Sequence, residues 1–249
     1  MPRKYARKTQ AKLRRRNRRR QGNKVPHLPG TLAPQHMITQ LKYVNQYQKN
    51  TPLGSAYGMF NQFRVNSIYD PDYTNTFGTS CLGLIQWRGL YQRYRVYKCA
   101  YTVRMTNLSA DCIASGAIVF QNYLDGTYSV SDTMRPLSRR FTLGNREGSN
   151  KATLKGVIHL PKLAGVTAQQ YKSDNNNLAG FGSSPVNPLF MTIIAASSNL
   201  TQAAGIAAQV DLTFFVEMMS TETSEALDLS TNLPVVPVAN VCTTPGSLS

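Results

Sequence analysis

Acidic residues are missing from the start of this chain, where the first carboxylate is Asp70. Bases are abundant there, and residues 1–24 alone hold twelve: Arg3, Lys4, Arg7, Lys8, Lys12, Arg14, Arg15, Arg16, Arg18, Arg19, Arg20 and Lys24. From Asp70 onward, 13 bases and 12 acids nearly cancel, although the formal net charge of the whole chain is +16. The asymmetry predicts a near-neutral folded body with a polycationic tail, whose natural partner is a polyanion such as nucleic acid.

Long apolar runs are also missing, which excludes several targeting and membrane classes. A secretory signal needs an apolar segment after its charges, but Lys24 is followed by VPHLP. The RRRNRRR block at residues 14–20 has no apolar face, which a mitochondrial presequence requires. The most apolar stretch, near residues 191–196, is too short to cross a bilayer. We therefore expect no insertion into a membrane.

Cysteine and histidine are scarce and are not spaced for metal or catalytic chemistry. Because Cys81, Cys99, Cys112 and Cys242 form no Cys-x-x-Cys pair, we expect reduced thiols rather than a zinc site. The chain has three histidines and lacks the H-E-x-x-H, G-x-S-x-G, P-loop and G-x-G-x-x-G patterns. The glycine-rich residues 180–183 lack the lysine and helix start that phosphate binding needs. The sequence predicts no enzyme, metal or cofactor.

Composition divides the chain into three zones. Residues 1–34 are basic and then contain Pro and Gly, with little to bury, so this arm should be disordered until it binds nucleic acid. Residues 35–220 carry almost every apolar residue and should form the folded domain. Residues 221–249 are rich in Ser, Thr and Pro and predict an extended C-terminal arm lying on a surface.

Alternation with a period of two dominates the folded domain. Tyr97, Cys99, Tyr101, Val103 and Met105 alternate with polar residues, which predicts a half-buried strand. Similar patterns place eight strands near residues 36–48, 59–68, 97–105, 113–123, 139–144, 153–160, 189–196 and 210–218. Residues 189–196 are apolar at both odd and even positions, so both faces of this strand should be covered, one of them by a neighbouring subunit. Eight strands joined by unequal loops predict an all-β fold, a single eight-stranded jelly roll of two packed antiparallel sheets.

One short helix is predicted within residues 84–95. Leu84, Trp87, Tyr91 and Tyr94 recur at helical spacing and should face the core, opposite a polar stripe that includes Arg88 and Arg95. The interleaved tyrosines and arginines could alternatively form a base-stacking platform for a single strand. A weaker, secondary set of nucleic-acid contacts is predicted for Arg88, Arg95, Arg139 and Arg140.

The Asp70-Pro71-Asp72 sequence is typical of a turn at a strand end, because Asp and Pro both favour turn geometry. Alternatively, the two carboxylates could bind calcium between subunits. The loops at residues 70–82, 124–138 and 162–188 are long and are expected to contribute to contacts between subunits.

Two segments behind the Arg-rich tail resemble a known family. FRVNSIYDPD at residues 63–72 and QWRGLYQRYRVY at residues 86–97 are similar to segments of the capsid proteins of circovirus-like, circular Rep-encoding single-stranded DNA viruses. The resemblance implies a single jelly roll in an icosahedral T=1 shell of about sixty subunits. It also implies a tail that faces the packaged DNA and nuclear import through the basic block. The tail mixes Gln, Asn and Lys among its arginines, so genus and host stay open.

The sequence as a whole therefore predicts a self-assembling coat protein that packages single-stranded DNA through its N-terminal arm. Residues 35–220 would be the shell domain, and the expected partners are copies of the same chain, single-stranded nucleic acid and host import receptors. The expected locations are the virion and, during assembly, the host nucleus. Two alternatives stay open: a coat protein of a small single-stranded RNA virus, and a nucleic-acid-binding protein that forms no shell.

Overall fold

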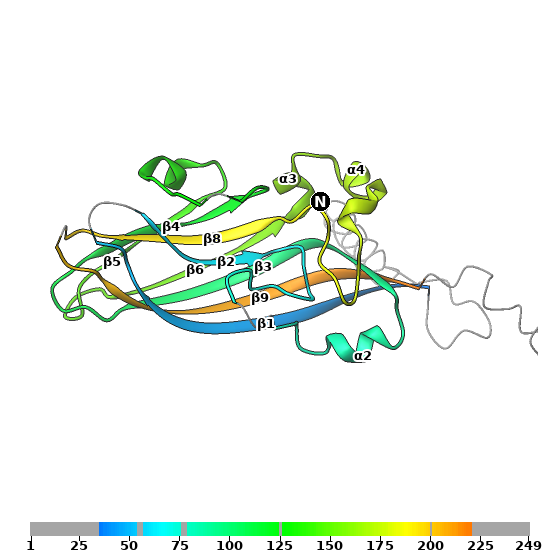
Figure 1. The fold of residues 1–249 in the computed structure, drawn as a ribbon, viewed down its shortest axis with the longest axis horizontal. Helices are drawn as coiled ribbons and strands as arrows, with labels where there is room; N and C mark the ends of the chain where they lie inside the picture. Colours follow the sequence, from blue (N-terminus) through cyan, green and yellow to red (C-terminus); the bar gives the residue numbers. More distant parts are fainter. Residues whose placement is uncertain (1–34, 54–56, 76–78, 125, 200, 221–249) are drawn as a thin grey trace, which may run out of the picture.

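A computed structural model describes residues 35–53, 57–75, 79–124, 126–199 and 201–220 of the chain. Two antiparallel β-sheets pack face to face and form an elongated sandwich (Figure 1). The N-terminal arm, the C-terminal arm and Cys242 lie outside the described residues. The described thiols, Cys81, Cys99 and Cys112, are free and buried.

The two sheets interleave strands that are far apart in the sequence. The first has the order β1 (His36–Asn50), β9 (Gly205–Met219), β3 (Arg93–Asn107) and β6 (Lys151–His159). The second has the order β2 (Gly58–Arg64), β8 (Phe190–Ser197), β4 (Ala114–Gln121) and β5 (Arg139–Leu143). This arrangement is a jelly roll, as predicted. The described residues contain nine strands rather than eight, because the two-residue β7 (Ala179–Gly180) pairs with the start of β3.

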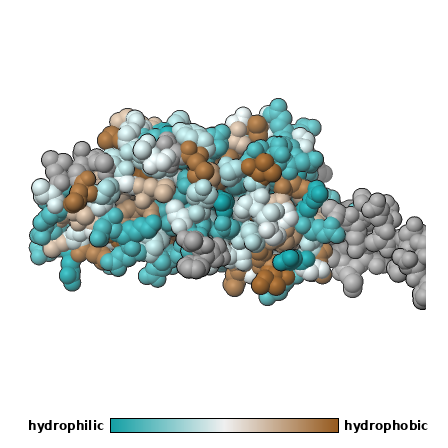
Figure 2. Space-filling view, viewed as in Figure 1, coloured by the Kyte–Doolittle hydropathy of each residue, from teal (hydrophilic) through white to brown (hydrophobic). Residues whose placement is uncertain are grey.

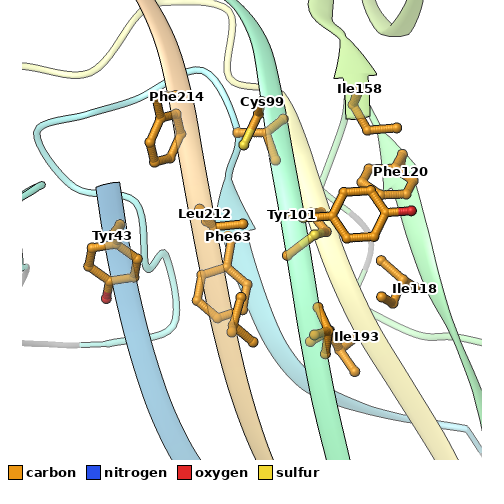
Figure 3. Close-up of a cluster of buried hydrophobic side chains, with 14 of the residues drawn as sticks. Tyr43, Phe63, Cys99, Tyr101, Ile118, Phe120, Ile158, Ile193, Leu212 and Phe214 are labelled. Atoms are coloured by element: carbon orange, nitrogen blue, oxygen red, sulfur yellow. The ribbon is translucent and has the colours of Figure 1, made fainter. Parts of the chain in front are cut away.

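The core lies between the sheets and follows the alternation in the sequence. Val210, Leu212, Phe214, Val216 and Met218 of β9 are at most 1% exposed, whereas the residues between them are partly exposed. Figure 3 shows the core layer that these side chains build with residues of the other strands, such as Phe63, Cys99, Ile118 and Ile193. Burial of this apolar surface is the main force that holds the sheets together.

Strand β8 is buried along its whole length, as its uninterrupted apolar sequence predicts. One face packs into the core, and Ile194 on the other face contacts a small cluster that contains Tyr128 and Tyr57. Tyr128 belongs to the segment that leads into the 3-10 helix η1 (Val130–Met134). The expectation of a neighbouring subunit was therefore wrong for this site, because the second cover comes from the same chain.

The helix predicted for residues 84–95 is much shorter in the structure. α2 spans Leu84–Arg88 and ends at Gly89, and from Arg93 onward the chain belongs to β3. Tyr91 and Tyr94 are buried as predicted, but they reach the core from a turn and a strand. The reason is non-local: Arg93 to Asn107 pair with the long strand β9, and these ladder bonds outweigh the local helical pattern.

The described chain also has more helices than the one predicted. α3 (Leu160–Ala164) and α4 (Ala168–Ser173) follow β6 directly and precede the 3-10 helix η2 (Asn175–Asn177). α3 has Pro161 in its first turn and ends at Gly165, whose φ of 75° favours glycine. α4 begins with a capping box formed by Thr167 and Gln170. Each helix is too short to give a clear apolar period, which is why the sequence pattern did not indicate it.

The predicted turn lies at the end of the Asp70-Pro71-Asp72 segment rather than within it, because Asp72 pairs with Phe63 in an isolated bridge and the turn follows at Tyr73 and Thr74. The Asp72 carboxylate is 2% exposed and accepts hydrogen bonds from the Thr74 backbone N–H at 3.2 Å and the Thr74 hydroxyl at 2.8 Å, the geometry of an Asx turn. The amides of Asn45 and Asn61 donate to its other oxygen. Asp70 pairs instead with Arg64 at 2.5 Å. The two carboxylates therefore have separate protein partners.

Candidate nucleic-acid interface

The outward face of the first sheet carries an excess of basic side chains. They are Lys42 on β1, Lys98 and Arg104 on β3, and Lys151 and Lys155 on β6. Each alternates with residues that face the core, since successive side chains of a strand point to opposite sides of the sheet. We call these five residues the basic sheet face.

The two acidic residues of the same sheet, Asp211 and Glu217, both lie on β9 and are held in ion pairs. Asp211 binds Arg104 at 2.5 Å, and Glu217 lies 3.7 Å from both Arg95 and Lys172. The Lys98 ammonium lies 3.8 Å from the centroid of the Phe215 ring, a cation-π contact that leaves its charge in place. The basic sheet face therefore keeps a net positive potential that attracts phosphate.

The tail enters the fold at the edge of this sheet. β1 is an edge strand, it begins at His36, and it directly follows the basic arm in the sequence. The twelve predicted contact residues between Arg3 and Lys24 lie outside the described residues. The position of β1 nevertheless joins the arm to the sheet that carries the basic face rather than to the other sheet.

The four arginines predicted as secondary contacts do not form one patch. Arg88 is exposed on α2, which lies beside β1, whereas Arg139 and Arg140 lie on β5, in the other sheet (Figure 1). Arg139 and Arg140 point to opposite sides of β5, and the Arg140 Nε donates to the Thr133 carbonyl at 3.1 Å. The strand order places Arg95 on β3 of the first sheet and the pair Arg139 and Arg140 on β5 of the second.

Arg95 is the residue whose position differs most from the prediction. It was expected on an exposed helical stripe, but it lies on β3 and is 5% exposed. Glu217 stands opposite it in the β3–β9 register and neutralises it. Tyr171 of α4 donates to the neighbouring Val96 carbonyl at 3.1 Å, which holds α4 over this part of the sheet. Burial beneath α4 removes Arg95 from the surface of the subunit.

The base-stacking alternative for residues 88–98 is only partly compatible with these positions. Tyr91 is 2% exposed and Tyr94 is fully buried, so neither ring is available to a base. The Tyr94 hydroxyl donates to the Ser183 carbonyl at 2.9 Å, and burial raises the pKa of Tyr94 to about 12. Tyr97 is partly exposed and is the one tyrosine of this described segment that reaches the surface.

No protein-family model matches the chain, and no curated protein matches it. Solved structures similar to it include the decameric BFDV capsid protein, with a TM-score of 0.42 and 10% identity over 74% of this chain and 99% of that chain. A semi-empty particle of Macrobrachium rosenbergii nodavirus matches with a TM-score of 0.42 and 14% identity over 76% and 97%. Desmodium yellow mottle tymovirus matches with a TM-score of 0.35 and 11% identity over 80% and 96%. At these identities and TM-scores, we draw neither the fold nor the function from the matches.

Sequence reasoning missed the basic sheet face. The signal was present in Lys151, Thr153 and Lys155, which are polar at alternate positions of one strand. The other members lie on strands that are distant in the sequence, so only the strand order brings them together. Within the described ranges, no helix has the length and apolar character needed to span a bilayer.

Proposed function

We propose that this chain is a non-enzymatic viral capsid subunit. Copies of the jelly roll would assemble into a closed shell, and the N-terminal arm would neutralise a packaged single-stranded genome. The observation that carries the proposal is the joining of a twelve-base arm to the edge of the sheet that bears the basic face. That sheet would face the genome, since both clusters of positive charge then meet the same polyanion.

The distribution of charge also favours a shell over a nucleic-acid-binding protein that stays unassembled. A protein of the second kind usually spreads bases over its folded surface, but here the residues from Asp70 onward are almost neutral in sum. Near-neutral side surfaces can pack against copies of themselves with little repulsion.

Exposed apolar side chains around α2 are candidates for those subunit contacts. Leu82 is 84% exposed and Ile85 is 82% exposed, and Leu90 lies close by in sequence. A hydrophobic patch is visible in Figure 2 where Figure 1 places α2. Clustered apolar residues on a surface usually mark an interaction site. Leu82 is also the last residue of the loop at residues 70–82, and this loop is expected to contribute to a subunit contact.

We favour DNA over RNA as the packaged polymer because residues 63–72 and 86–97 resemble the circovirus-like capsid proteins. The phosphate charge is the same in both polymers, so the arm alone does not discriminate between them. Treating nucleic acid extracted from native particles with DNase or RNase tests the choice. Digestion by RNase alone would favour the coat protein of a small RNA virus.

Deletion of residues 1–24 tests the capsid proposal. The deletion removes twelve charges and no described core residue, so the body should still form shells, but these shells should hold almost no nucleic acid. In a shell of about sixty subunits the tails would supply on the order of 700 charges, enough to offset a similar number of phosphates. Electron microscopy measures assembly, and the absorbance ratio of purified particles measures their content.

Salt dependence gives a second measurement on the same variants. Binding of the intact chain to single-stranded DNA should weaken with salt by a log-log slope of roughly −0.7 per phosphate engaged. The deletion variant should show a shallow slope. A matched control replaces Lys4, Lys8, Lys12 and Lys24 with arginine, keeps the charge, and should package as the natural chain does. An undiminished slope after the deletion would contradict the role of the arm.

We also propose that the basic block at residues 14–24 directs nuclear import in the host, where assembly would take place. Clustered bases on an extended chain suit the acidic surfaces of import receptors. A fluorescent protein fused to this block should accumulate in the nucleus, and a matched fusion with glutamine at the basic positions should not. Cytoplasmic retention of the first fusion would contradict this part of the proposal.

A further inference from the structure

A β-bulge turns one aromatic ring of β3 away from the core. The register of β3 against β9 shifts between Val96 and Lys98, which leaves Tyr97 as an extra residue. Val96 and Cys99 both face the core, with Tyr97 and Lys98 between them. Bulges commonly re-aim a side chain in this way. Sequence alternation predicted Tyr97 in the core, and the bulge is the reason that it lies at the surface instead.

A basic pocket opens beside this site, between the edge strands of the two sheets. It has a volume of about 310 Å³, and its polar lining comes from Tyr101 on β3, Ser138 and Arg139 at the start of β5, His159 on β6 and Lys162 on α3. Burial raises the pKa of the Tyr101 hydroxyl, and the Arg139 guanidinium acts in the opposite direction. Figure 3 shows the hydroxyl of Tyr101 pointing away from the centre of the core.

The absence of a side chain at position 156 gives Tyr101 its place in this pocket. A Cβ at Gly156 would lie 2.6 Å from the Tyr101 hydroxyl oxygen, so only glycine leaves room for the ring on the neighbouring strand. Gly156 also lines the pocket. The result is a concave site lined by hydrogen-bond donors, among them the cationic side chains of Arg139 and Lys162.

An apolar groove adjoins the basic pocket. It has a volume of about 720 Å³ and is lined by Tyr97, Pro161, Gly165, Val166 and Ala168, together with His159 and Lys162, which line both cavities. Neither lining contains Asp or Glu. The acid that acts electrostatically on Tyr97 is Glu217, which forms ion pairs with Arg95 and Lys172. The paired cavities thus combine a positive end with an apolar, aromatic end.

We propose that the two cavities form a nucleotide-binding subsite for single-stranded nucleic acid, with a backbone phosphate at Arg139 and Lys162 and a base against Tyr97. Arginine and lysine bind phosphate oxygens, and an aromatic ring stacks on a base of any identity. A base in a duplex is already stacked and paired, so the groove selects a single strand. Lys98 stands opposite His159 in the β3–β6 register and connects the subsite to the basic sheet face.

This inference rests on the proposed packaging function and adds a fixed site in the folded body to the contacts of the arm. Its test must report on that site in the full chain, where the arm also binds nucleic acid. Photocrosslinking is suitable because it is resolved by residue. The probe is a short oligothymidylate that carries 5-iododeoxyuridine, and crosslinked peptides are mapped by mass spectrometry. Tyr5 in the arm serves as the internal reference.

The full-length chain should crosslink at both Tyr5 and Tyr97. In the double variant Arg139→Gln and Lys162→Gln, the crosslink yield at Tyr97 relative to that at Tyr5 should fall by about fivefold or more. Loss of the phosphate contacts should release the stacked base, and fivefold corresponds to the lower end of the free energy for stacking one base. Both side chains are exposed, so the fold should persist, and circular dichroism verifies this. Arg146→Gln, which removes an exposed charge outside both pockets, should leave the ratio unchanged.

Crosslinks at Tyr5 without any at Tyr97 would overturn the subsite and leave the packaging function standing. A Tyr97 yield that is unaffected by the double variant would likewise overturn the phosphate assignment. Absence of crosslinks at both tyrosines would contradict the packaging function itself. Retention of the crosslink in Tyr97→Phe would support stacking by an aromatic ring rather than a contact through the tyrosine hydroxyl.

Discussion

Phe141 on β5 stands directly opposite Gly116 on β4, and its ring fills the space above the glycine. A Cβ at position 116 would lie 2.5 Å from the Phe141 Cζ and would also collide with the Ile194 carbonyl of β8. Gly116 therefore lets three strands of the second sheet approach while an aromatic neighbour covers the gap.

Gly116→Ala should destabilise the subunit by about 1–3 kcal/mol, the usual cost of overpacking a core. Because the nearest obstacle is a backbone carbonyl, a change of rotamer cannot relieve the clash. The midpoint of urea unfolding measures the effect. Gly182→Ala is the matched control, since a Cβ there meets nothing within 4 Å. Equal midpoints for the two variants would contradict this account of Gly116.

Two ion pairs between β3 and β9 differ in burial and should differ in their contribution to stability. The side chains of Arg95 and Glu217 are 7% and 12% exposed, whereas those of Arg104 and Asp211 are 49% and 29% exposed. Glu217→Gln leaves the buried Arg95 charge without its opposite partner and should cost about 3–5 kcal/mol. Asp211→Asn breaks a solvent-screened pair and should cost at most about 1 kcal/mol.

Chemical unfolding of both variants at neutral pH provides the comparison. The double variant Arg95→Met with Glu217→Gln removes the buried charge as well and should recover part of the loss. Similar losses for Glu217→Gln and Asp211→Asn would show that Arg95 remains hydrated when its partner is removed.

Trp87 is half-buried rather than enclosed in the core. It packs against the main cluster, and its ring centroid lies 6.1 Å from that of Tyr91. Trp87→Ala should cost about 1.5–2.5 kcal/mol, roughly half the value for a fully buried tryptophan. Ile85→Ala on the same helix is the control, because Ile85 is 82% exposed and should have little effect on unfolding. A loss above about 3 kcal/mol would indicate full enclosure of the ring.

Strand β9 could be predicted because it buries one face and alternates with a period of two over its full length, and β8 could be predicted because its sequence is apolar throughout. The end of the helix within residues 84–95 could not be predicted, because the apolar residues keep regular helical spacing through the whole segment. The residues from Arg93 onward form a strand rather than a helix because Arg93 pairs with Met219 and Arg95 with Glu217. A partner some 120 positions away has no local signal in the sequence.

The same limit applied to the site. The charge of the arm could be read directly because the arm is contiguous, whereas the basic sheet face and the paired pockets come from β1, β3, β5, β6, α3 and α4. The bulge at Tyr97 reverses the expected orientation of one ring and is set by the β3–β9 register. Arg139 was named from the sequence, but its pocket exists only because β5 and β6 are edge strands of facing sheets.

Buried tyrosines should make the fold sensitive to alkali. Burial raises the pKa of Tyr94 to about 12, and it also raises the pKa values of Tyr47 and Tyr171. A pKa that is higher in the folded state means that the unfolded chain releases its proton first. The stabilisation is therefore complete below about pH 10, the ordinary tyrosine value, and is lost as the pH rises toward 12. Each such group should lower the free energy of unfolding by about 1.4 kcal/mol per pH unit in that range.

Tyr94→Phe isolates one of these groups. At neutral pH the variant should lose about 1 kcal/mol, because the hydrogen bond to the Ser183 carbonyl is gone. Between about pH 10 and pH 12, however, its free energy of unfolding should fall less steeply than that of the natural chain. The difference should be the slope for one proton, about 1.4 kcal/mol per pH unit. Urea unfolding at a series of alkaline pH values measures both slopes. If Tyr94→Phe and the natural chain lose stability in parallel, then the Tyr94 hydroxyl is hydrated in the folded state and the alkaline lability has another origin.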